Sequence, residues 1–268
     1  MQYRRLGDAG MKVSAIALGG WINYGEGKLG DDPARQVVRR AYERGINFFD
    51  LADIYGKGEA ERQMGAVLRD YPRHTLVIST KVFWPMSDDV NDRGLSRKHL
   101  FESIDKSLRR LGTEYVDIYF CHRPDPDTPI EETARAMDDL IRMGKVLYWG
   151  TSEWSASEIA EAHSLCERHG WAKPKVEQPQ YSMLVRERVE REILPATEPR
   201  GIGLVVWSPL AMGMLTGKYD EGVPADSRFA REEWARDRLM SDDNAARVRR
   251  LRPIAEGLGV SRAQLALA

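Results

Sequence analysis

The chain has 268 residues, of which 42% are hydrophobic and 30% charged, and its formal net charge is -1. This near-neutral balance argues against a nucleic-acid-binding surface, which needs a strong basic excess, and no apolar run reaches the length of about 18 residues that a membrane span requires. The first residues lack the apolar segment of a secretory signal, and Cys121 and Cys166 are the only cysteines, so we expect a reduced, cytoplasmic protein.

Short apolar segments alternate with amphipathic ones along the chain. A turn-rich cluster at residues 7–10 predicts a small β-hairpin over residues 3–14. Apolar runs closed by turn residues then predict seven buried strands, at residues 16–19, 48–50, 76–81, 116–121, 146–150, 174–178 and 203–207. Helical periodicity is found between these strands, for example over residues 59–68 and 187–198.

Several helix boundaries are marked by capping signals. Asp32 followed by Pro33 predicts the start of the first helix, with Asp32 as the N-cap. Residues 128–131 and 155–158 both have the capping-box pattern of a hydroxyl residue followed three positions later by glutamate. Helix ends are expected at Gly45, Gly112 and Gly170, because glycine adopts the left-handed conformation that closes a helix.

Seven strand–helix units with a spacing of about 30 residues indicate a parallel sheet covered by helices. An open doubly wound sheet and a closed (β/α)8 TIM barrel both fit, and seven units without a shift in composition favour the barrel, as one domain over residues 1–268. Residues 208–243 form a long insertion, which is usually functional. Helices are expected over residues 244–257 and from Ser261, without an eighth strand, so we expect an α/β barrel lacking its last βα unit in a shortened chain.

Four polar side chains fall at or just after predicted strand ends: Asp50, Tyr55, Lys81 and His122. Barrel enzymes carry their chemistry at these ends, and adjacent parallel strands lie about 4.8 Å apart, so the four groups can converge. A buried Asp50 needs a cation, which Lys81 supplies. We expect the lysine to lower the pKa of Tyr55 and so make the phenol a usable proton donor near neutral pH.

In this arrangement His122 can hydrogen-bond an incoming carbonyl oxygen. Taken singly, each of the four residues fits a structural role better: an ion pair, a core tyrosine and a loop histidine. Taken together on successive strand ends, they favour a catalytic site.

Other motifs have structural interpretations. Residues 25–30 have the spacing G-x-G-x-x-G but do not follow a strand directly, so a flexible entrance loop is expected. Tyr24 and Lys28 are spaced like a short-chain dehydrogenase pair but are surrounded by glycines rather than set in a helix. Residues 213–219 are one residue short of a P-loop. The histidines show no metal-binding spacing, so no metal is expected.

Three segments carry a resemblance to a known family. Residues 49–56, 79–81 and 122–125 resemble the signature segments of the aldo-keto reductases, nearest the branch that contains the voltage-gated potassium channel beta subunits. Supporting segments follow in the same order, at residues 93–99, 123–129, 148–152 and 207–211. The resemblance implies a (β/α)8 barrel that transfers hydride from NADPH to the carbonyl carbon of a small aldehyde or ketone.

The resemblance also implies residue roles. Tyr55 is the general acid, Asp50 and Lys81 tune it, and His122 orients the carbonyl. NADP(H) is expected to contact Gly20, Trp21, Asp50, Ser152, Gln178, Trp207, Ser208, Pro209, Leu210, Ala211, Gly213, Lys218 and Arg228. Its nicotinamide would stack near Tyr181 or Trp207, and the loop after the seventh strand is favoured. Substrate would be walled by Trp21, Tyr24 and Trp84, although Trp21 and Trp84 fit equally well as plugs of the barrel mouth.

An alternative from another functional class is an NADPH-binding accessory or redox-sensing subunit with little turnover, as in the channel-related branch. His122 stands where channel subunits carry asparagine, which favours an enzyme.

A third alternative is a barrel that has lost its cofactor through truncation. The family's 2′-phosphate contacts would lie after Ala268, so the NADP preference rests on the resemblance. The expected partner is a small carbonyl substrate, neither nucleic acid nor membrane, and homo-oligomers are left open.

Overall fold

The computed structural model describes residues 1–25 and 29–268. The chain divides into two compact units, one formed by Met1–Gln178 with Pro195–Leu204 and the other by Pro179–Leu194 with Val205–Ala268. Glu26, Gly27 and Lys28, which belong to the G-x-G-x-x-G segment and to the Tyr24–Lys28 pair, lie outside the described residues. Within the described ranges, no helix combines the length and the apolar character needed to cross a membrane.

The first unit begins with the predicted hairpin, in which β1 (Tyr3–Arg5) pairs antiparallel with β2 (Lys12–Ser14). A seven-stranded sheet follows in simple chain order, with every neighbouring pair parallel. Its strands are β3 (Leu18–Gly19), β4 (Phe48–Asp50), β5 (Val77–Val82), β6 (Val116–Cys121), β7 (Val146–Thr151), β8 (Val176–Glu177) and β9 (Gly203–Leu204). The seven predicted strands are therefore confirmed.

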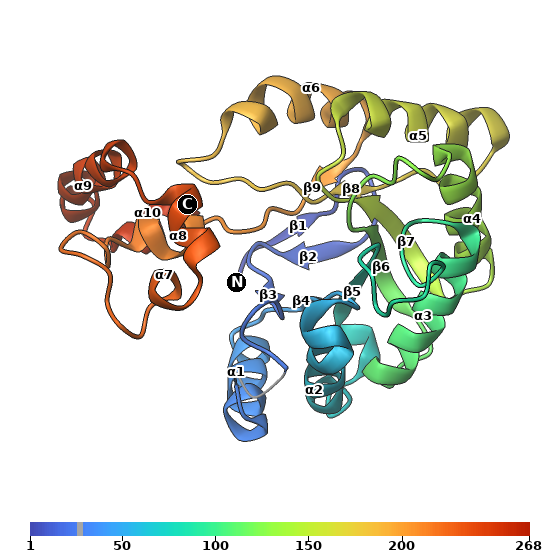
Figure 1. The fold of residues 1–268 in the computed structure, drawn as a ribbon, viewed down its shortest axis with the longest axis horizontal. Helices are drawn as coiled ribbons and strands as arrows, with labels where there is room; N and C mark the ends of the chain where they lie inside the picture. Colours follow the sequence, from blue (N-terminus) through green and yellow to red (C-terminus); the bar gives the residue numbers. More distant parts are fainter. Residues whose placement is uncertain (26–28) are drawn as a thin grey trace. The chain divides into compact units, whose positions relative to one another are not determined.

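Helices separate successive strands of the sheet (Figure 1). They are α1 (Asp31–Glu43), η1 (Tyr55–Gly58), α2 (Glu59–Leu68), η2 (Arg73–Thr75), α3 (Arg97–Leu111), α4 (Ile130–Arg142) and α5 (Ala156–His169). The segment between β8 and β9 contains a π-helical turn (Val189–Ile193), α6 (Leu194–Thr197) and η4 (Glu198–Arg200) in place of one regular helix. The curled parallel sheet with alternating helices is an incomplete (β/α)8 barrel preceded by a hairpin.

The capping predictions have mixed outcomes. The Ser155 capping box with Glu158 is present, and Gly112 and Gly170 close α3 and α5 at φ 68°. The N-cap of α1 is Gly30 rather than Asp32, because the helix begins at Asp31 and places both aspartates in its first turn, where the helix dipole favours them.

The predicted box at Thr128 is also wrong. Pro129 is the N-cap of α4 without a side-chain bond, and the Thr128 hydroxyl donates to Asp125 Oδ2 at 2.8 Å instead. Asp125 Oδ2 also accepts a hydrogen bond from the backbone N–H of Leu95 at 2.7 Å. The Thr128 hydroxyl therefore bonds to this carboxylate instead of capping α4.

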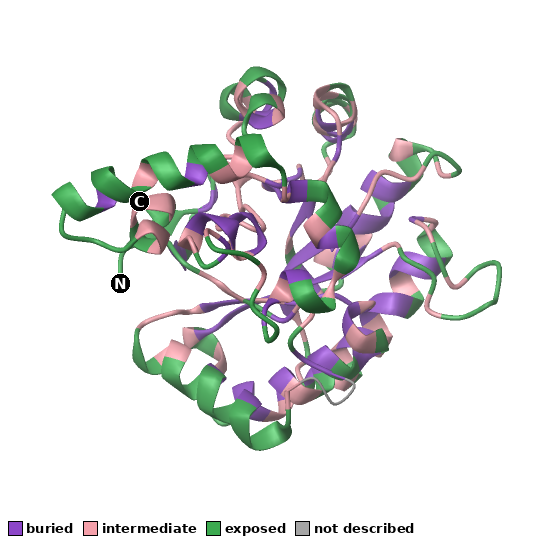
Figure 2. Cartoon of the chain, turned by 60° about the vertical axis from the view of Figure 1, so that its left-hand side comes forward, coloured by how far each residue is buried: buried purple, intermediate pink, exposed green. Residues whose placement is uncertain are grey.

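The hydrophobic core of the first unit lies between its strands and the inner faces of its helices, which appear purple in Figure 2. Phe48 and Phe49 are 1% and 0% exposed, and Trp149 is completely buried. On α1, Val38 is buried, whereas Val37 is 42% exposed. Both cysteines are buried and free.

The second unit is mostly helical and contains the predicted long insertion. Its elements include η5 (Ala211–Thr216), α7 (Arg228–Arg231), α8 (Glu233–Leu239), α9 (Asp242–Gly257) and α10 (Arg262–Leu267). Tyr219 stacks on Phe229 at 4.2 Å between ring centroids, and Arg262 donates to Asp220 at 2.7 Å. The insertion therefore has its own buried contacts.

Candidate active site

Asp50 and Lys81 form a buried ion pair on the neighbouring strands β4 and β5. Lys81 Nζ donates to Asp50 Oδ2 at 2.6 Å and to the carbonyl oxygen of Leu51 at 2.7 Å, and the lysine side chain is 0% exposed. Ser79, two residues earlier on the same face of β5, donates to Asp50 Oδ1 at 2.6 Å. Burial opposes the charge on Lys81, but Asp50 and Tyr55 together outweigh burial and raise the pKa of the lysine. Lys81 is therefore an ammonium at neutral pH.

Tyr55 begins the short helix η1 and directs its hydroxyl to this ion pair. Lys81 Nζ donates to the phenolic oxygen at 3.2 Å, and Tyr55 is 9% exposed. Burial raises the pKa of Tyr55, and the Lys81 ammonium offsets only part of this effect. The predicted lowering of this pKa is therefore wrong in direction. Removing the phenolate from water raises the pKa more than the Lys81 ammonium lowers it, and the negative charge of Asp50 raises it further. The phenol keeps its proton at neutral pH.

His122 follows β6 and lies beside the phenol. The Tyr55 and His122 rings are 5.8 Å apart between centroids and meet edge to face at 78°. Burial and the nearby charges of Lys81 and Arg123 hold the pKa of His122 well below its usual range, so the imidazole is neutral. Within residues 1–25 and 29–268, the buried His122 Nδ1 has no hydrogen-bond partner. Buried polar atoms are rarely left unpaired, so this nitrogen indicates a site for a ligand or a water molecule.

The three aromatic residues predicted to wall a substrate pocket have different positions. The Trp21 ring lies 6.4 Å from the Tyr55 ring, and the Trp84 ring lies 6.3 Å from the His122 ring. Trp84 is 38% exposed, whereas Tyr24 is 4% exposed, and burial raises the pKa of Tyr24 to about 12. Trp21 and Trp84 thus flank the phenol and the imidazole, while Tyr24 is a buried residue.

Three of the residues predicted to contact cofactor surround Asp50. Gln178 Nε2 donates to Asp50 Oδ1 at 3.2 Å, and Ser152 Oγ donates to the backbone carbonyl of Gln178 at 2.9 Å. The Gly20 N–H donates to the Asp50 carbonyl at 2.8 Å. A Cβ added to Gly20 would lie 2.6 Å from Leu51 Cδ2, so only glycine fits here without displacement. The structure brings these residues together with the ion pair.

The remaining predicted cofactor residues lie in the second unit, in a loop with unusual backbone geometry. Ser208, Ala211, Met212 and Gly213 have φ values of 53°, 50°, 55° and 98°. Left-handed conformations are strained in residues other than glycine and are typical of functional loops. Trp207, Pro209 and Leu210 are half-buried in the same segment.

Two cations follow this loop. Lys218 lies against it, because a Cβ added to Gly213 would be 2.8 Å from Lys218 Cε. Arg228 is half-buried at the start of α7. Tyr181 commits its hydroxyl to Glu190 Oε1 at 2.7 Å.

A second buried charged cluster, which the sequence did not reveal, lies behind Lys81. Glu61 accepts from Thr80 Oγ1 at 2.5 Å and from Arg110 Nε at 2.6 Å, and Asp53 accepts from Ser103 Oγ at 3.0 Å. Burial and the nearby Glu61 carboxylate raise the pKa of Asp53 to about 8. Asp53 belongs to the signature segment at residues 49–56, which was the available signal, but its partners become apparent only once α2 and α3 are placed.

The first cluster can therefore transfer a proton. A protonated phenol, a fixed ammonium and a neutral imidazole lie together, which suits donation to an oxygen that becomes negative during reaction. Across the described ranges, no group of histidine, cysteine or carboxylate side chains is arranged to hold a metal ion.

Comparisons with known proteins place the chain in a family. A profile described as "Aldo/keto reductase family" matches residues 15–268. The chain is 48% identical over 273 residues to an Arabidopsis thaliana protein named "Probable voltage-gated potassium channel subunit beta", covering 100% of this chain and 83% of that relative. A protein of the same name from Oryza sativa subsp. japonica matches with the same identity and coverage. The chain therefore belongs to the aldo/keto reductase family, a family of oxidoreductases.

Proposed function

We propose that this protein is an NADP-dependent reductase of small aldehydes or ketones, with Tyr55 as the general acid. Family membership supports an oxidoreductase in general. The finer proposal depends on one observation: the Lys81 ammonium donates both to the Tyr55 phenol and to Asp50, within a buried site. A protonated phenol held against a fixed cation is suited to protonating an oxygen.

The residues would act as follows. Tyr55 donates its proton to the carbonyl oxygen as negative charge develops there, and Lys81 stabilises the phenolate that remains. Asp50 keeps the lysine charged and directed at Tyr55 through its 2.6 Å ion pair. The neutral His122 donates an N–H to the same oxygen and so orients the carbonyl, while Trp21 and Trp84 flank the substrate.

Bound NADPH would supply the hydride. The orphaned His122 Nδ1 and the groups around Asp50 fit a nicotinamide end, whose carboxamide Ser152 and Gln178 would hold. Residues 208–213 fit the phosphates, because positions 208, 211, 212 and 213 have left-handed backbone conformations, which are found in anion-binding loops. Lys218 and Arg228 would add charge-assisted bonds to these phosphates.

The names of the two relatives favour a second candidate, an NADPH-binding accessory subunit with little turnover. Titration of NADPH by fluorescence, followed by an aldehyde panel monitored at the nicotinamide absorbance, separates the candidates. The reductase oxidises NADPH in step with alcohol formation. Tight binding without oxidation favours the accessory subunit, and the absence of NADPH binding contradicts both.

A further inference from the structure

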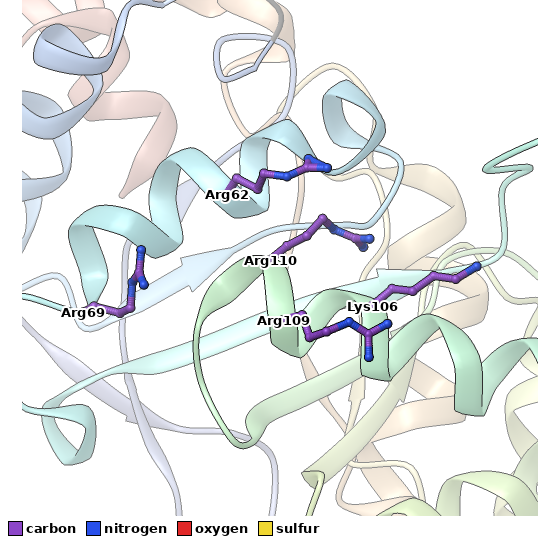
Figure 3. Close-up of a pocket in the computed structure, with 5 residues that line it drawn as sticks. All are labelled: Arg62, Arg69, Lys106, Arg109 and Arg110. Carbon is purple, nitrogen blue, oxygen red and sulfur yellow. The ribbon is translucent and has the colours of Figure 1, made fainter.

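Five cationic side chains line one hollow on the helical surface of the first unit. Its volume is about 490 Å³. Figure 3 shows the five residues around two neighbouring helices: Arg62 lies on α2, Arg69 directly follows α2 as its C-cap, and α3 carries Lys106, Arg109 and Arg110. The hollow contrasts with the chain as a whole, whose formal net charge is -1.

The carboxylates around the hollow neutralise only part of this charge. Three ion pairs have N–O distances of 2.6, 2.9 and 2.6 Å, formed by Arg62 with Glu59, Lys106 with Asp92, and Arg110 with Glu61. Arg69 donates its Nε to the Gly65 carbonyl at 3.3 Å and, like Arg109, has no carboxylate partner among residues 1–25 and 29–268. The hollow therefore keeps a surplus of positive charge.

This charge arrangement is unfavourable by itself. Arg109 and Arg110 lie three and four residues after Lys106 on α3, the spacing at which like charges face and repel each other. A bound anion would relieve this repulsion and form bidentate bonds with the guanidinium groups.

One cation is already fixed in position. The Arg110 side chain is 13% exposed and is held by the fully buried Glu61 and by Ser107 Oγ at 3.0 Å. The side chains of Arg62 and Lys106, by contrast, are 51% and 41% exposed. A rigid guanidinium surrounded by exposed cations lowers the ordering cost of binding, because part of the site is formed beforehand.

The lining also defines the ligand class. The volume of the hollow lies within the range of about 300 to 1,000 Å³ that is typical of small-molecule sites. Such sites are mostly apolar, whereas all the residues that line this hollow are cationic. No aromatic or aliphatic residue is available to cover a base or an acyl chain. We propose that this hollow binds a small polyphosphate, a chain of two or three phosphate groups. The proposal does not depend on the reductase activity.

Isothermal titration with inorganic tripolyphosphate at constant ionic strength tests the site. We expect one tripolyphosphate per chain, and at least tenfold weaker binding in the double variant Arg62→Ala/Arg109→Ala. Both residues are exposed and lie outside the proposed active site, so melting temperature and NADPH binding should be unchanged. A matched control, Arg247→Ala/Arg250→Ala, removes two exposed arginines from α9 and should bind as the native protein does.

A further variant, Lys218→Ala/Arg228→Ala, distinguishes the hollow from the loop proposed to bind cofactor phosphates, and it should retain tripolyphosphate binding. The proposal is overturned if the native protein does not bind, if the α9 control loses affinity equally, or if only the Lys218/Arg228 variant loses it. Sedimentation with vesicles containing an anionic phospholipid supplies the last arm. Vesicle binding that depends on Arg62 and Arg109, without tripolyphosphate binding, would replace the proposed ligand with a membrane surface.

Discussion

The two faces of β5 carry two different clusters of buried charge, because successive residues of a strand point in opposite directions. On one face, Lys81 holds Asp50 and donates to Tyr55. On the other, Thr80 donates to Glu61, which also accepts from Arg110. Lys81 and Glu61 are both 0% exposed, so burial does not distinguish the two clusters.

The difference lies in which side chains surround the charge, because Asp53 Oδ1 in the second cluster also lacks a hydrogen-bond partner in the described part of the chain. Both Glu61 oxygens accept a hydrogen bond, one from Thr80 Oγ1 and one from Arg110 Nε. The Lys81 cluster, in contrast, contains a phenol that keeps a transferable proton and is flanked by His122, whose Nδ1 is unpaired in the described part of the chain. Because an unpaired buried atom occurs in both clusters, the proposed catalytic role rests on the phenol and the imidazole that lie beside the Lys81 ammonium.

Replacing Lys81 should have the largest effect. Lys81→Met leaves Asp50 without its cation and Tyr55 without a neighbour to stabilise the phenolate, so we expect turnover to fall by about 10³-fold or more. The free energy of unfolding should fall by about 3–5 kcal/mol, because the variant strands a buried charge. Steady-state kinetics and urea unfolding measure both. Turnover within tenfold of the native value would remove Lys81 from the mechanism.

His122→Gln tests the open side of the same cluster. Turnover should fall by about 10²-fold through loss of carbonyl orientation, while the melting temperature stays close to native, because the imidazole is neutral and its Nδ1 forms no bond in the described structure. The ratio of kcat to KM for one aldehyde gives the readout. A large loss of stability with unchanged kcat would make His122 a structural residue.

Glu61→Gln tests the second buried charged cluster. It removes the carboxylate that holds Arg110, so we expect unfolding to become easier by about 2–3 kcal/mol and kcat to change less than about threefold. Glu59→Gln is a matched control, because its ion pair with Arg62 is half exposed and should contribute less than about 1 kcal/mol. A loss of turnover in Glu61→Gln larger than its loss of stability would join the two clusters functionally.

For Asp53 we expect an effect on stability that depends on pH. Its pKa rises from 3.8 to about 8 on folding, so between these values the folded chain binds more protons than the unfolded chain. The stability that this carboxyl contributes is complete below pH 3.8 and is lost as pH rises through about 8. Asp53→Asn should therefore gain stability relative to the native protein as pH rises, in unfolding experiments between pH 5 and 9. Parallel pH curves would contradict the raised pKa.

The sheet and the first cluster could be predicted because both depend on local pattern. Apolar runs such as residues 116–121 form strands, and Asp50, Lys81 and His122 follow from where such runs end. The resemblance to the family added the residue roles, and the matched profile confirms the family.

The remaining features depend on tertiary contacts. Asp125 captures the Thr128 hydroxyl from the expected capping box, and its other partner, the Leu95 N–H, lies 30 residues away. The pKa of Tyr55 was predicted in the wrong direction because burial, which outweighs the lysine, cannot be measured from spacing. Glu61 and Arg110 are 49 residues apart and meet only when α2 packs on α3.

Tyr55→Phe tests the central claim most directly, because it removes one hydroxyl and keeps the ring. Single-turnover mixing of NADPH-loaded protein with an aldehyde should show oxidation slowed by at least about 10³-fold with unchanged NADPH affinity. Tyr24→Phe, which removes a buried hydroxyl without a partner in the described residues, should oxidise NADPH at the native rate. Equal rates in the native protein and in Tyr55→Phe would contradict proton donation by this phenol.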